Sequence, residues 1–127
     1  MHIKINNATE LKSVATILHD ARFTANGIDY DATAHTFILK CWACEPKPKG
    51  VGVTSGWQAH GLSFTNVTGC KVNVKEKVSY YELATIRFNE RDSRLDLIAH
   101  YAVEISLQLG QLDGALTETG ERLEHWK

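Results

Sequence analysis

The sequence predicts an α+β fold: a mostly antiparallel β-sandwich or open barrel with one N-terminal helix packed on it. Three observations support this prediction. A single stretch, 8–20, has apolar residues at helical spacing. Most later apolar residues alternate with polar ones, which is the period of a half-buried strand. The alternating runs also follow one another without intervening helices, and strands connected in this way pair antiparallel.

The helical stretch has one apolar face, made by Leu11, Val14, Ala15, Leu18 and Ala21. Asn7 is the expected N-cap, and Glu10 follows three residues later, the spacing of a capping box. An amphipathic helix needs an apolar surface to cover. We therefore expect it on one face or end of the β core.

Alternation predicts strands over 1–6, 28–31, 36–43, 62–67, 70–74, 82–88 and 112–116. The clearest pattern spans 94–109, where eight apolar residues alternate: Leu95, Leu97, Ala99, Tyr101, Val103, Ile105, Leu107 and Leu109. A single strand of this length is unusual. We expect either one long bent strand or two strands broken near residues 100–102.

The length of 127 residues predicts one domain, 1–127. Residues 46–61 hold both prolines and four glycines, which predicts a long loop. Residues 118–127 are polar and predict a frayed tail or short helix.

The composition argues against two classes of partner. The formal net charge of −1 gives no general attraction to nucleic acid. No window approaches the ~18 apolar residues of a membrane span. The N-terminus lacks a signal-peptide pattern and the three cysteines are an odd number, so we expect a cytoplasmic protein.

Cys41 and Cys44 form a Cys-x-x-Cys pair, to which Cys70 and His60 could add zinc ligands. An offset of three places two side chains on opposite faces of a strand, so we expect free thiols and no metal or other cofactor. The glycine-rich stretch 50–56 has no following helix, so it does not predict a phosphate-binding loop.

Two groups of acid–base residues are candidates for a catalytic site. His19 and Asp20 are neighbours on the predicted helix, where their side chains would diverge. Asp96, His100 and Glu104 would share one strand face but lie ~13 Å apart for each four residues, which is too far for one metal. The sequence therefore predicts no catalytic residues and favours a non-catalytic protein.

We expect a module that binds a protein partner or itself. Trp57 and His60 of the 46–61 loop are the expected contact residues, since loops on β scaffolds carry recognition sites. The 94–109 region is expected to form a homodimer, because a long apolar strand risks leaving an unpaired edge. The alternative is a small-molecule-binding or hydrolytic β domain, with its pocket between the N-terminal helix and the 46–61 loop.

Overall fold

A computed structural model of the protein describes residues 2–44, 56–100 and 102–123. The described residues form one α-helix, one 3-10 turn at 25–27 and a series of strands. In chain order the elements are β1 (His2–Ile5), α1 (Ala8–Ile17), β2 (Arg22–Phe23), β3 (Ile28–Asp31), β4 (Thr36–Cys44), β5 (Trp57–Phe64), β6 (Val67–Val74), β7 (Tyr81–Glu82), β8 (Thr85–Asn89), β9 (Arg94–Ala99), β10 (Val103–Leu109) and β11 (Gly114–Leu123).

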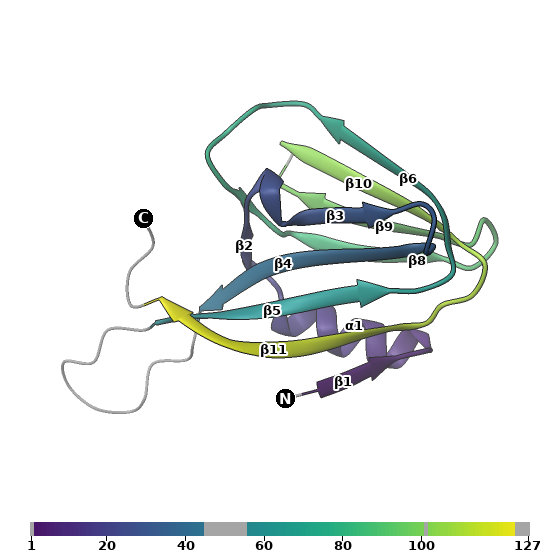
Figure 1. Ribbon diagram of the computed structural model, residues 1–127, viewed down its shortest axis with the longest axis horizontal. Helices are drawn as coiled ribbons and strands as arrows, with labels where there is room; N and C mark the ends of the chain where they lie inside the picture. The colour runs from purple at the N-terminus through teal and green to yellow at the C-terminus, as the bar shows by residue number, and fades with distance from the viewer. Residues whose placement is uncertain (1, 45–55, 101, 124–127) are drawn as a thin grey trace.

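The strands form two antiparallel sheets that pack as a sandwich (Figure 1). The seven-stranded sheet has the order β1-β11-β5-β4-β2-β7, with β3 also paired to β4. The four-stranded sheet has the order β6-β10-β9-β8. The predicted fold class is confirmed: within the described residues the strands form two separate sheets that pack like a sandwich and do not close into a barrel.

The core lies between the sheets and consists of the inward side chains of both. Strands β4, β9 and β10 alternate buried and more exposed residues over most of their length, as their sequence patterns predict. The fully buried core side chains include Phe37, Leu39, Leu62, Phe64, Leu95, Leu97, Ile105 and Leu107.

Helix α1 begins and ends for identifiable reasons. The Asn7 side chain accepts a hydrogen bond from the Glu10 N–H at 2.9 Å, which confirms the predicted N-cap. The helix ends at Ile17, earlier than expected, because Leu18 is its C-cap and Asp20 has a φ of 65°. Its buried face packs beside β1 and β8, so α1 fills one side of the sandwich between the two sheets (Figure 1).

The 94–109 region forms two strands, β9 and β10, which confirms the second of the two expected arrangements. The chain turns at His100, whose φ is 32°. Strand β9 lies between β8 and β10, and β10 lies between β9 and β6. Neither strand therefore has a free edge, which removes the reason for expecting a homodimer through 94–109.

Two predictions about irregular segments were wrong. The 46–61 loop ends sooner than expected, because β5 starts at Trp57 and pairs with both β4 and β11. Hydrogen bonding to two neighbours outweighs the low strand propensity of Gly61. Residues 118–123 are not a tail but the second half of β11, which continues past a register shift between Glu118 and Arg122. Residues 46–55 and 124–127 lie outside the described residues.

Candidate functional site

The structure places the two expected contact residues, Trp57 and His60, in strand β5 and not in a loop. Trp57 therefore lies at the start of a strand and not in the loop that the sequence predicts. Trp57 is half-buried, and the Arg22 guanidinium carbon lies 4.4 Å from its ring centroid. The same guanidinium lies 4.7 Å from the ring of Tyr80, so Arg22 sits against two aromatic rings. This cation–π contact links Trp57 of β5 to Arg22 of β2 within the same chain.

His60 is only 4% exposed and lies on the inner face of β5, opposite Cys41 of β4. Its Nδ1 is 3.0 Å from the Gln58 carbonyl oxygen, and its Nε2 is 3.9 Å from a Glu118 carboxylate oxygen. Both ring nitrogens thus face groups of the same chain. At 4% exposure, His60 offers a partner almost no accessible surface.

The three cysteines lie in different environments. Cys41 is in the core and Cys44 is exposed, so the expected divergence of the pair is confirmed. Burial raises the pKa of the Cys41 thiol to about 12 and also raises the pKa of Cys70. A raised pKa lowers the thiolate fraction at neutral pH, which makes these two thiols poor nucleophiles and poor metal ligands.

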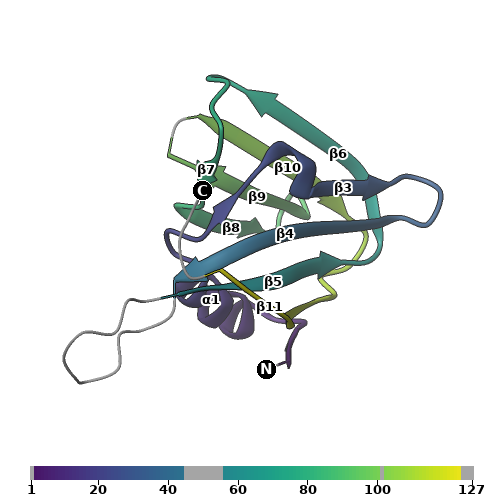
Figure 2. The same cartoon turned by 60° about the vertical axis from the view of Figure 1, so that its left-hand side comes forward.

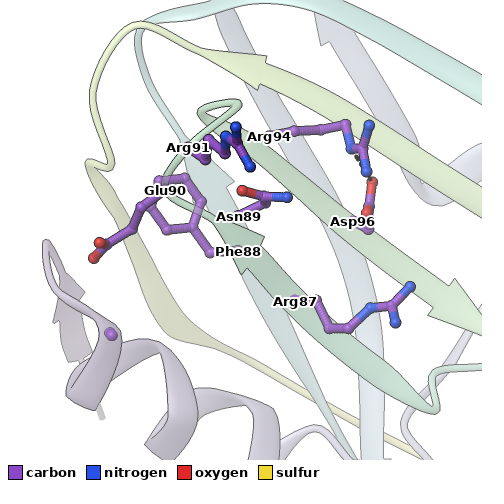
Figure 3. A pocket seen from close by; sticks show the side chains of 8 residues that line it. Arg87, Phe88, Asn89, Glu90, Arg91, Arg94 and Asp96 are labelled. Carbon is purple, nitrogen blue, oxygen red and sulfur yellow. Dashed lines mark ion pairs between the residues drawn. The ribbon is translucent and has the colours of Figure 1, made fainter.

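A shallow cavity of about 760 Å³ borders the β8–β9 turn and contains three arginines (Figure 3). Arg94 Nε lies 3.3 Å from Asp96 Oδ1, and the same oxygen accepts a hydrogen bond from the Ser106 hydroxyl at 2.8 Å. Arg87 and Arg91 lie at opposite ends of the cavity with Asn89 between them (Figure 3). Because these guanidinium groups do not converge, the cavity does not form a compact anion site.

Strand β6 forms the second feature, one free edge of the four-stranded sheet. Val72 and Val74 are opposite Ile105 and Val103 of β10 and share their inward face. Ile105 and Val103 are buried, whereas Val72 is 41% and Val74 is 51% exposed. Val78, just beyond the strand, is 40% exposed. We define the β6 edge as these three valines together with Lys71, Lys75 and Lys77.

The third feature is a group of three side chains, Asp20, Glu82 and His100, which the sequence analysis did not expect to meet. His100 does not share a strand face with Asp96 and Glu104, because it lies in the β9–β10 turn. Its Nε2 is instead 3.2 Å from Asp20 Oδ1 and 3.9 Å from Glu82 Oε2. His19 also contacts Asp20, at 3.2 Å, because the helix ends before both residues. Turn geometry at Asp20 and His100 and the pairing of β7 with β2 bring this group together, so no spacing in the sequence could have revealed it.

The expected alternative pocket between α1 and the 46–61 loop involves residues 46–55, which lie outside the described residues. A different cavity of about 390 Å³ borders Glu82 and His100 and includes Tyr80 and Tyr81 in its wall. It lies beside the acid–histidine group described above.

Comparison of the chain with protein-family models, with curated proteins and with solved structures found no match. Within the described residues, no helix is long and apolar enough to cross a membrane; α1 has only ten residues.

Proposed function

We propose that this chain is a protein-interaction module that receives an extended segment of a partner protein along the β6 edge. One observation carries the proposal: the inward valines of β6 are about half exposed, although their register partners in β10 are fully buried. An added strand would cover these valines. It would also use the backbone groups on the side of β6 that faces away from β10.

The charge of the β6 edge indicates the chemistry of the partner. Lys71, Lys75 and Lys77 flank the exposed valines, and of these Lys75 forms an ion pair with Glu104 at 3.0 Å. An extended segment that alternates apolar and acidic residues would place its apolar side chains beside the valines and its carboxylates beside the lysines. Such opposite-charge cross-strand pairs stabilise strand pairing, and like charges oppose it.

The same lysines argue against pairing with a second copy of this chain. Two β6 strands related by a two-fold axis would bring lysines together across the new interface. Lysines on sheet edges are a common device against self-association. The partner that fits best is therefore another protein with an acidic, extended segment.

A synthetic eight-residue peptide of alternating valine and glutamate tests this proposal against a peptide of alternating valine and lysine. We expect the acidic peptide to shift and protect the β6 amide signals of the isotope-labelled protein in NMR spectra. The Val74→Asn substitution should weaken this binding about tenfold or more, because it removes apolar surface from the site.

Ile38→Asn is the matched control, since Ile38 is 44% exposed but lies on β4 of the other sheet. Equal binding of the two peptides, or an equal effect of the two substitutions, would contradict the proposal. Concentration-dependent dimerisation that Val74→Asn abolishes would assign the edge to a second copy instead.

A further inference from the structure

Three side chains from distant parts of the sequence meet beside the Tyr80–Tyr81 cavity. Asp20 follows α1, Glu82 is the last residue of β7, and His100 lies in the turn between β9 and β10. One ligand atom from each lies within 4.8 Å of the others. We propose that Asp20, Glu82 and His100 form a binding site for a divalent transition metal, of which zinc fits the donor set best. This inference is independent of the proposed function of the β6 edge.

The distances are close to those of a coordinated ion. Zinc bonds to nitrogen and oxygen are about 2.0–2.2 Å long, so tetrahedral ligand atoms lie roughly 3.3 Å apart. His100 Nε2 and Asp20 Oδ1 are already 3.2 Å apart, and Glu82 Oε2 is 3.9 Å from the same nitrogen. Small side-chain rotations would close the remaining gap. Side-chain exposures of 59% for Asp20, 36% for Glu82 and 49% for His100 leave room for them.

The charge around the three side chains favours a cation. Two carboxylates converge here, and the neighbouring cation is Arg22, whose Nε lies 3.7 Å from Glu82 Oε1. Arg22 thus approaches one oxygen of Glu82, while the other oxygen faces His100. A mixed set of one imidazole and two carboxylates suits zinc, whereas an all-oxygen set would favour magnesium or calcium.

A neighbouring group also supports the orientation that the site requires. His19 Nδ1 lies 3.2 Å from Asp20 Oδ2, so it contacts the oxygen that does not face His100. Polar contacts to the second carboxylate oxygen orient carboxylate ligands in metal sites. His19 is therefore a positioning residue, and Asp20 Oδ1 remains directed toward the metal position.

Three protein ligands leave one zinc coordination position for water or a small ligand, the arrangement of zinc sites that exchange ligands. The cavity of about 390 Å³ that borders Glu82 and His100 offers space for such a ligand. The sequence-based expectation of no metal rested on the cysteines and on the long spacing between His100 and Asp96 or Glu104. In the structure His100 lies beside Asp20 and Glu82 and not beside Asp96 and Glu104.

Zinc binding to the full-length chain, measured by calorimetry, tests the proposal. A Cys44→Ser background prevents the exposed thiol from contributing a competing ligand. We expect one zinc ion per chain. His100→Asn should weaken binding by about 100-fold or more, since loss even of groups that only hydrogen-bond to a metal ligand costs about 10–100-fold.

His35→Asn is the matched control, because His35 is an exposed turn histidine with positive φ, as is His100. Glu82→Gln provides a nearly isosteric second variant and should also weaken zinc binding, so the test does not depend on the folding of one substitution. Absence of saturable zinc binding would overturn the proposal. So would a loss caused equally by His35→Asn, or binding that survives both His100→Asn and Glu82→Gln.

Discussion

The two edge strands of the four-stranded sheet, β8 and β6, differ in how far their inward side chains are covered. At β8 the inward residues Ile86 and Phe88 belong to or pack against the core, and α1 lies beside the strand. At β6 the inward residues Val72 and Val74 are 41% and 51% exposed. Figure 2 shows β6 along the margin of the molecule away from α1. Both strands alternate, so alternation determines which face points inward, whereas a neighbouring element determines whether that face is covered.

The covered edge strand β8 and the uncovered edge strand β6 therefore differ in what they contribute to the protein. Strand β8 gains apolar contact with α1, which contributes stability in proportion to the area buried. Strand β6 retains an apolar strip and a free backbone edge, and its lysines limit unwanted pairing. The asymmetry therefore separates a stabilising side of the sandwich from a side available for recognition.

The strongest test of this comparison places the same substitution on each side. Val14 of α1 is fully buried, whereas Val74 of β6 is half exposed. Val14→Asn should lower the free energy of unfolding by about 4 kcal/mol, since it removes buried apolar surface and buries an unsatisfied amide. Val74→Asn should lower it by less than about 1 kcal/mol. Urea denaturation measures both, and similar losses would show that the two edges are covered alike.

The fold class was predictable because its signals are local. The face shared by Leu11, Val14 and Leu18 predicted α1, and the period-two pattern of 94–109 predicted a hairpin as one alternative. The extents of β5 and β11 were not predictable, because Gly61 and the polar residues after Glu118 carry little strand propensity. Strand β5 forms by pairing with both β4 and β11, and the second half of β11 forms by pairing with β5.

Because the extent of β5 was not predicted, Trp57 was expected in a loop as a contact residue. As a half-buried residue of β5 with Arg22 against its ring, it should contribute to stability. Trp57→Ala should cost about 2 kcal/mol, less than a fully buried tryptophan. A double-mutant cycle with Arg22→Lys should show a coupling of about 1 kcal/mol, because lysine cannot stack as a planar guanidinium does. A loss below about 0.5 kcal/mol would return Trp57 to the class of exposed, recognition-type residues.

The proposed metal site could not be predicted from the sequence for a different reason. Asp20 and His100 both have positive φ, and each lies where an expected regular element ends early or breaks. The direction of a side chain in such a turn depends on the few residues around it and not on a repeating period. Glu82 reaches the site because β7 pairs with β2, which begins two residues after Asp20.

A smaller test weakens α1 without changing its buried face. Asn7→Ala removes the side-chain oxygen that accepts from the Glu10 N–H and should cost about 1 kcal/mol. Asn73→Ala on β6 is the matched control and should change stability by less than about 0.5 kcal/mol. Amide hydrogen exchange should also become faster in α1 and in the adjacent β8 after the first substitution. Unchanged exchange in β8 would show that α1 does not protect that edge.

The smallest expected effect concerns a charge placed at residue 106, on the outer face of the four-stranded sheet. Ser106 is part-buried and donates a hydrogen bond to Asp96, so the sign of the charge should matter. Ser106→Asp places a second carboxylate directly opposite Asp96, whereas Ser106→Lys supplies an opposite charge there. Lys71 is paired with residue 106 on the other side, but Lys71 is exposed while the Asp96 side chain is only 15% exposed, so solvent screens the Lys71 charge more and Asp96 decides the sign. The aspartate variant should be less stable than the lysine variant by roughly 0.5–1 kcal/mol. Because salt screens charges near the surface, 1 M NaCl should reduce this difference. Equal stability at low salt would mean that the outer face is fully solvated at this position.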